Sequence, residues 1–189
     1  MRIAAIGATL EPMFDLDTFI ADCLAANQEA QPRLAVKEVL DRAVASPGEV
    51  AAALPPDRAE LVRLHVSDEL TILKVVWAPG MSIRPHDHRT WASIGIFSGG
   101  EDNAFFRRDD GGLTETGGRE LRPADVCLLG DDTIHKVTNP TREHAGAIHI
   151  YGGDFFTIER SEWDEDTLVE QPYDVEATLR NFEAANAGR

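Results

Sequence analysis

The chain has 189 residues, and 18 Lys and Arg against 33 Asp and Glu give it a formal net charge of −15. This length fits one domain with a sizeable core, and the 43% hydrophobic content is that of an ordered globular protein. So acidic a surface repels phosphate backbones and anionic lipid, which argues against nucleic-acid and membrane partners. No uncharged apolar run approaches the ~20 residues that a membrane span needs.

The cysteines and the first residues bear on the cellular compartment. Cys23 and Cys127 lie far apart in the sequence, in segments of different predicted structure. Residues 1–7 are too short for the apolar part of a signal peptide, and Pro12 follows soon after. We therefore expect a reduced, cytoplasmic protein without a disulfide, either a monomer or a small homo-oligomer.

The first third of the chain has the periodicity of helices. Apolar side chains between residues 16 and 24 recur at i, i+3, i+4, i+7 and i+8 behind Asp15, a candidate cap. The same spacing recurs in residues 36–44, with Pro32 suitably placed at the helix start. Residues 46–48 end that segment, and residues 55–56 close a short Ala-rich piece after it. We assign residues 1–58 to an N-terminal helical arm.

Between residues 60 and 160 the pattern changes to short β-branched and aromatic runs separated by glycines. Many short strands at regular spacing indicate a β-sandwich or barrel rather than a parallel α/β sheet. Residues 161–189 then form a C-terminal tail with a last helix capped by Asp174, and residues 1–189 are expected to form a single domain. We expect strands at 71–77, 91–97, 103–107, 126–129, 145–151 and 155–160, with glycine breaks at 99–100, 109–112, 117–118 and 152–153.

Three histidines have the spacing of metal ligands. His86 and His88 are two residues apart on a predicted strand or strand entrance, so both imidazoles can point to the same face. His135 lies in a later strand-like run, residues 133–137, and can supply a third ligand. The structural alternative for the pair alone is a polar strand face.

The residues around these histidines resemble the two metal motifs of the cupin superfamily. Gly80, His86 and His88 fit Gly-x5-His-x-His with Gly99 as the closing glycine, and residues 135–139 fit His-x3-Asn. The resemblance implies a mainly β fold, the cupin double-stranded β-helix or jelly-roll barrel. It also implies that His86, His88 and His135 bind one metal ion.

The departures from the cupin pattern are informative. The position of the usual metal-binding Glu holds Ala92, followed by Ser93, while Ala124, Gly130 and Asp132 replace turn residues of the second motif. The turn changes do not affect the ligands. Loss of the Glu leaves three neutral ligands, so a divalent ion keeps its full charge and open positions for anions.

A three-His cupin without the Glu resembles the cysteine dioxygenase and 3-mercaptopropionate dioxygenase family. Residues 77–80, 90–91 and 94–95 look like the bacterial members, and residues 148–152 resemble the Ser-x-His-x-Tyr motif with Ala147 at the Ser position. The resemblance covers residues 60–160. It implies a mononuclear non-haem Fe(II) enzyme that oxidises a small thiol acid with O2 to a sulfinate, with His149 and Tyr151 as catalytic residues. Neither Ala92 nor Ser93 can be cross-linked to Tyr151, so a free phenol is expected.

The carboxylate of a thiol acid needs a cationic partner. Arg63 lies where the cysteine-specific branch has such an arginine, and Arg160 where the mercaptopropionate branch is similar, although either can be a solvated strand residue. We expect faster turnover of 3-mercaptopropionate than of cysteine. His65 and His144 have the character of surface or strand-end residues.

Three alternatives stay open. His149 and Tyr151 can be a structural pair on a half-buried strand. The metal site can belong to a three-His cupin that cleaves a carbon–carbon bond in a diketone-like substrate, or to a binding module without turnover.

Overall fold

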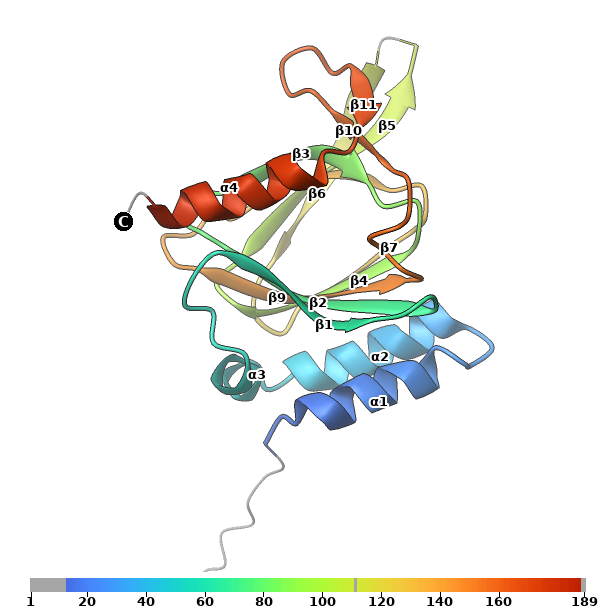
Figure 1. Ribbon diagram of the computed structural model, residues 1–189, viewed down its shortest axis with the longest axis vertical. Coiled ribbons are helices and arrows are strands. Elements are labelled where there is room, and N and C mark those ends of the chain that lie inside the picture. Colours follow the sequence, from blue (N-terminus) through green and yellow to red (C-terminus); the bar gives the residue numbers. More distant parts are fainter. Residues whose placement is uncertain (1–12, 111, 188–189) are drawn as a thin grey trace, which may run out of the picture.

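Two antiparallel sheets and four helices make up the computed structural model, which describes residues 13–110 and 112–187. Figure 1 shows α1 to α3 together on one side of the sheets and α4 on another. The helices are α1 (Leu16–Ala26), α2 (Pro32–Val44), α3 (Pro47–Ala53) and α4 (Val175–Ala187). The strands are β1 (Glu60–Val66), β2 (Leu70–Trp77), β3 (Ser82–Asp87), β4 (Ala92–Ser98), β5 (Glu101–Asp109), β6 (Gly112–Leu121), β7 (Val126–Leu129), β8 (Ile134–Thr138), β9 (Ala145–Gly152), β10 (Ser161–Trp163) and β11 (Glu170–Pro172).

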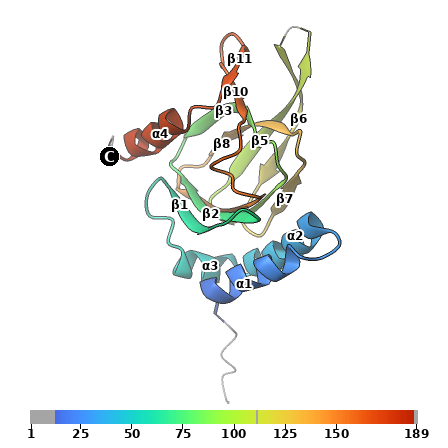
Figure 2. The same cartoon turned by 45° about the vertical axis from the view of Figure 1, so that its right-hand side comes forward.

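The strand pairing is that of a long hairpin rolled on itself. The sheets have the orders β1-β2-β9-β4-β7 and β11-β10-β3-β8-β5-β6. Within the stretch from β2 to β9, the first strand pairs with the last, the second with the seventh, the third with the sixth and the fourth with the fifth. The chain thus alternates between two facing sheets, as Figure 2 shows. This is a double-stranded β-helix, so the predicted mainly β cupin fold is confirmed.

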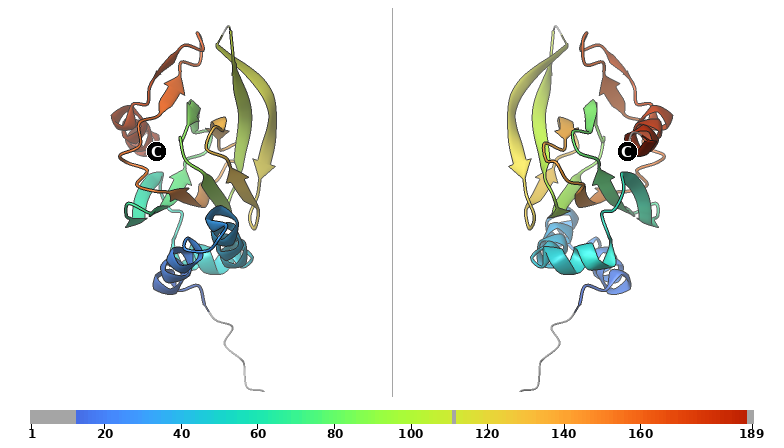
Figure 3. Two further views of the ribbon diagram at one scale, coloured as in Figure 1. Left: turned by 90° about the vertical axis from the view of Figure 1, so that its right-hand side faces the viewer. Right: turned by 90° about the vertical axis from the view of Figure 1, so that its left-hand side faces the viewer.

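The N-terminal helices cover the outer face of the five-stranded sheet (Figure 3). Asp15 caps α1 as expected, because its Oδ1 accepts a hydrogen bond of 2.8 Å from Thr18 N. Leu40 of α2 packs against Gly95 of β4 so closely that a Cβ at residue 95 would lie 2.8 Å from Leu40 Cγ. Glycine at this position therefore allows the helix to seat on the sheet.

The C-terminal helix closes one side of the barrel. Asp174 caps α4 as expected, accepting a hydrogen bond of 2.8 Å from Ala177 N. Phe182 is buried and stacks on Trp77 with ring centroids 5.2 Å apart. Asn186 bonds to both backbone groups of Ala59, which ties the end of α4 to the start of β1.

Two sequence expectations about strands are wrong. Residues 155–160 form turns, because Asp154 accepts a hydrogen bond from Phe156 N at 2.9 Å and Arg160 donates one to Phe155 O at 2.7 Å. The glycines at 117–118 lie inside β6, where the register with β5 shifts and Gly117 has a φ of 148°. They form a bulge rather than a break.

The strands β6, β10 and β11 were not among those expected, and the last two extend the sheet beyond residue 160. Residues 1–7, the subject of the signal-peptide expectation, and Gly111 lie outside the described residues. Across residues 13–110 and 112–187, no helix combines the length and apolar character needed to cross a membrane.

Candidate metal centre

The three predicted ligand histidines meet inside the barrel. His86 lies near the end of β3 and is the register partner of His135 on β8, while His88 follows directly after β3. His88 Nε2 lies 3.2 Å from His86 Nε2 and 3.1 Å from His135 Nε2. Their relative exposures are 6%, 2% and 1% for His86, His88 and His135, so this is not a solvated polar strand face.

In His86 and His135, the hydrogen bond at Nδ1 shows that Nε2 faces the centre of the cluster. His86 Nδ1 lies 3.0 Å from Arg84 O, which can only accept, so Nδ1 carries the hydrogen. His135 Nδ1 lies 2.6 Å from Asn103 Oδ1, likewise an acceptor. Each neutral ring therefore presents an Nε2 lone pair to the centre, as metal-binding histidines held by a second hydrogen bond do.

Burial keeps these rings neutral. It lowers the pKa of His86 to about 4 and, together with the neighbouring histidines, lowers the pKa of His88 and His135 well below 6.5. Converging lone pairs repel one another unless a cation lies between them. These three nitrogens would hold one divalent ion between them and would leave it further coordination positions for other ligands. The donor set therefore fits a divalent transition metal ion.

Asp87, between the first two histidines, anchors this segment from the opposite side. Its carboxylate, 1% exposed, lies 2.7 Å from Arg89 Nε and 2.9 Å from Arg108 Nη2. It also accepts a hydrogen bond of 2.8 Å from Ser161 N. Arg89 has a φ of 56°, unusual for a side chain of this size, so the turn after His88 is held by these contacts.

Tyr151 and His149 of β9 lie in the same cavity. The Tyr151 hydroxyl is 3.0 Å from His149 Nδ1, and the Tyr151 ring meets the His88 ring edge-on at 5.0 Å between centroids. Burial raises the pKa of Tyr151, so its phenol keeps its proton. Ala92 is the register partner of Tyr151 on β4 and offers only a methyl group. The position of the usual cupin Glu thus lies beside Tyr151 without a polar atom.

Sequence reasoning missed two groups in this network, the carboxylate of Glu101 and the amide of Asn103. Glu101 and Asn103 face inward from β5, with exposures of 0% and 3%. Glu101 Oε2 accepts a hydrogen bond of 2.9 Å from Trp77 Nε1, and Oε1 accepts one of 3.0 Å from Asn103 Nδ2. His149 Nε2 lies 3.3 Å from Glu101 Oε2, within the range of an ion pair although it has no well-aligned hydrogen bond. Two polar residues with the period of a strand, directly after a glycine turn, were the available signal.

The cavity at the centre is small, and strands of both sheets and α4 form its walls. Its volume is about 40 Å³, and besides the three ligands it is lined by residues such as Tyr151, Phe155, Tyr173 and Phe182. None of the residues that line it is an Asp, Glu, Lys or Arg. An anionic ligand in this cavity therefore meets no fixed negative charge in direct contact.

The two predicted substrate arginines differ in their placement. Arg160 lies between two aromatic rings, with Cζ 4.0 Å from the Phe155 centroid and 4.4 Å from that of Tyr173, and both rings line the cavity. Its Nε is buried without a hydrogen-bond partner, and burial lowers the pKa of the guanidinium. Arg63 is exposed and stacks on Phe156 at 3.7 Å, away from the lining.

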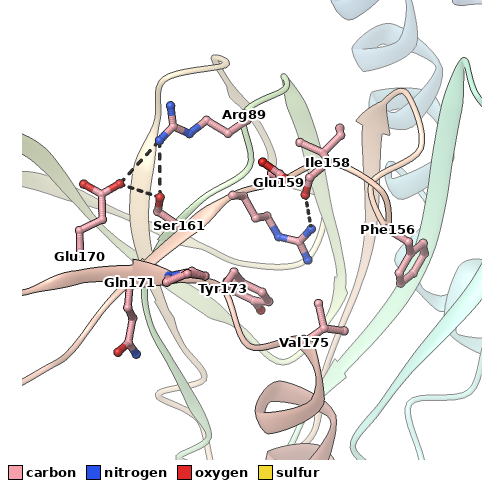
Figure 4. A pocket seen from close by; sticks show the side chains of 11 residues that line it. Arg89, Phe156, Ile158, Glu159, Ser161, Glu170, Gln171, Tyr173 and Val175 are labelled. Carbon is pink, nitrogen blue, oxygen red and sulfur yellow. Dashed lines mark hydrogen bonds and ion pairs between the residues drawn. The ribbon is translucent and has the colours of Figure 1, made fainter.

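A wider pocket of about 910 Å³ with polar and apolar lining residues lies outside the cavity and shares Tyr173 with it. Figure 4 shows Arg89, Ser161 and Glu170 joined along its rim, with Ser161 Oγ 2.6 Å from Glu170 Oε1. Arg160 also lines this pocket. His65 and His144 are among the residues of neither pocket, and His65 Nε2 lies 3.2 Å from Ser67 Oγ on the edge strand.

No protein-family model matches the chain. Among solved structures, oxalate oxidase in complex with glycolate is 19% identical over 45% of this chain and 42% of that chain, with a TM-score of 0.40. An RmlC-like cupin from Methanocaldococcus jannaschii is 11% identical over 53% and 86%, with a TM-score of 0.43. A cupin superfamily protein from Desulfitobacterium hafniense is 20% identical over 52% and 80%, with a TM-score of 0.41.

The chain thus spans less than half the length of the oxalate oxidase that it matches. The pairing of the strands and the three buried histidines are observed in this structure and do not depend on these comparisons. The protein is a cupin-type double-stranded β-helix with a three-histidine candidate metal centre.

Proposed function

We propose that the protein is a mononuclear iron dioxygenase that oxidises a small thiol acid to its sulfinate. The observation that carries this proposal is the combination of three neutral ligands with the hydrogen-bonded pair Tyr151 and His149 in one closed cavity. A binding site for metal alone does not require a buried phenol next to the ligands. The overall reaction is R–S⁻ + O2 → R–SO2⁻, in which two S–O bonds form, the O–O bond breaks and sulfur is oxidised.

Iron held by the three Nε2 atoms supplies coordination positions and redox chemistry for a thiolate and O2. The protein supplies a neutral ligand set, so the negative charge comes from the substrate. The Tyr151 phenol keeps its proton and is hydrogen-bonded to His149, which holds the phenol group in the cavity beside the ligands. Walls of aromatic and aliphatic side chains exclude water.

The charges around the cavity favour a carboxylate thiol without an amino group. Arg160 lies against the Phe155 and Tyr173 rings that line the cavity, so its positive charge is placed to attract a carboxylate. An ammonium group in the cavity would have no carboxylate among the lining residues, and burying it unpaired costs several kcal/mol. We therefore expect 3-mercaptopropionate to react faster than cysteine.

The cavity also limits the substrate. At about 40 Å³ it holds little more than a water or O2 in the closed form. Tyr173 separates it from the outer pocket, so substrate entry requires displacement of this side chain or of its neighbours in the C-terminal segment. This route passes Arg160, which lies against the Tyr173 ring.

The test is oxygen uptake by the full chain loaded anaerobically with Fe(II), against 3-mercaptopropionate, cysteine and acetylacetone, with the product identified by mass spectrometry. We expect one thiol consumed per O2 and a sulfinate product. Tyr151→Phe should keep its iron and lose about 10- to 1,000-fold in turnover, whereas His135→Ala should lose iron and activity together.

Inertness toward every thiol with iron fully loaded would refute the proposal. Uptake with acetylacetone instead would identify a diketone-cleaving enzyme, and no uptake with any substrate would leave a metal-binding module. An unchanged rate for Tyr151→Phe would assign the tyrosine to structure rather than to catalysis.

A further inference from the structure

Glu101 is a buried carboxylate that the proposed reaction does not use. It is 0% exposed at the start of β5, and three side chains direct nitrogen atoms toward it: Trp77, Asn103 and His149. A buried carboxylate is stable only when such donors replace its water. The site is therefore constructed around a charged Glu101.

The ionisation state of Glu101 follows from these neighbours. Burial alone would raise its pKa, but contact with His149 and hydrogen bonds from Asn103 and Trp77 lower the pKa below 4.5. The carboxylate is thus ionised at neutral pH and can only accept hydrogen bonds. The His149 nitrogen that faces it, Nε2, must then carry a hydrogen.

The other nitrogen of His149 faces Tyr151. In the tautomer with its single hydrogen on Nε2, the ring presents the lone pair of Nδ1, 3.0 Å from the Tyr151 oxygen. The Tyr151 hydroxyl then donates to His149, and its orientation relative to the three ligands is fixed. A carboxylate on the far side of an imidazole controls its tautomer in this way in other enzymes.

We propose that Glu101 is a positioning residue that holds His149 as its Nε2–H tautomer and thereby orients Tyr151. In the family that the sequence resembles, a serine two residues before the histidine is available for this task, but here that residue is Ala147. Ala147 is fully buried on β9 and has no polar side-chain atom. Glu101 approaches His149 from β5 instead. The effect of Glu101 on turnover rests on the proposed function, whereas its effect on the tautomer of His149 does not.

A second chain of hydrogen bonds connects the carboxylate of Glu101 to the metal centre. Asn103 donates from Nδ2 to Glu101 Oε1 at 3.0 Å, which directs its Oδ1 to His135 Nδ1 at 2.6 Å. Glu101 therefore orients both the hydrogen-bonding pair and one ligand. The orientations of the Tyr151 phenol and of the ligand His135 therefore both depend on Glu101.

The first test needs no variant. Long-range 1H–15N spectra of the zinc-loaded, diamagnetic protein distinguish protonated from unprotonated imidazole nitrogens. We expect His149 to be protonated on Nε2 at neutral pH. An unprotonated Nε2 in the wild-type protein overturns the proposal, whatever the enzyme's activity.

The second test is Glu101→Gln, with Glu60→Gln as the control because Glu60 pairs with Lys74 at 2.7 Å outside the cavity. We expect Glu101→Gln to mix the tautomers of His149 and to lower kcat about 10-fold or more. The KM for 3-mercaptopropionate should change less than twofold, since Glu101 does not line the cavity. Glu60→Gln should change neither.

A rescue separates positioning from general damage to the core. Adding Ala147→Ser to Glu101→Gln provides a hydroxyl two residues before His149 on the same strand face, and it should restore part of kcat and one tautomer. Unchanged kcat and tautomer in Glu101→Gln, or loss of its iron with the tautomer intact, overturns the proposal. If wild-type protein is inactive on all thiols, the proposed function fails while the spectra still decide the role of Glu101.

Discussion

Without metal, the three-histidine cluster should make the protein sensitive to mild acid. His86 has an ordinary pKa of 6.5, which burial in the folded protein lowers to about 4. The pKa of His88 is also lowered, first by burial and then by His135 and His86, and that of His135 first by burial and then by His86. In the unfolded chain these rings take up protons near pH 6.5, and in the folded protein they do not.

The sign and size follow from proton linkage. Between pH 6.5 and 4 the unfolded state binds more protons, so the free energy of unfolding falls as the pH falls. At about 1.4 kcal/mol per pKa unit, the shift of His86 alone corresponds to about 3 kcal/mol over this range and about 2 kcal/mol at pH 5. The other two ligands add to this loss. For a domain stabilised by about 5–15 kcal/mol, the effect is large.

Urea unfolding of the metal-free protein at pH 7, 6 and 5 measures this loss, in a range where most carboxyl groups stay ionised. His86→Leu removes one of the three titrating rings, so its unfolding free energy should fall less steeply with pH than that of the wild type. A free energy of unfolding that is flat between pH 7 and 5, or an equal slope in the variant, would refute the reasoning.

Three further outcomes are expected. Asn103→Ala should weaken zinc binding about 10- to 100-fold in competition with a chelator, because His135 loses its orienting acceptor. Arg160→Ala should raise the KM for 3-mercaptopropionate at least 10-fold, while Arg63→Ala, on the exposed face of β1, should leave it within twofold. Phe182→Ala should lower the free energy of unfolding by about 3 kcal/mol through loss of its packing on Trp77, as measured with urea.

The barrel could be predicted from the sequence because its strands are short, apolar and separated by turn residues. The expected strands at 71–77 and 145–151 match β2 and β9 within one residue at each end. Residues 155–160 could not be assigned correctly, because their aromatic and β-branched composition is that of a strand. Their conformation depends on Asp154 and on the contact of Arg160 with Phe155 O, which composition does not reveal.

The site was predictable to the extent that its residues share a motif. His86 and His135 are close because adjacent strands β3 and β8 carry them in register, and His88 follows directly after β3; motif spacing captures these relations. Glu101 has no fixed spacing to His149, since the two lie on strands of different sheets that face each other across the core. Contacts between facing sheets leave no periodic signal along the chain.

The position of the carboxylate bears on the proposed preference for an anionic substrate. In the usual cupin pattern a Glu binds the metal directly and reduces its charge, but here Ala92 occupies that position. The negative charge lies instead on Glu101, which reaches His135 only through Asn103. A carboxylate that does not bind the metal directly can still orient a ligand. It would neither reduce the charge of a bound ion nor occupy a coordination position that a substrate could take. Moving this charge back, by Ala92→Glu, should therefore strengthen metal binding and weaken thiolate binding in the same protein.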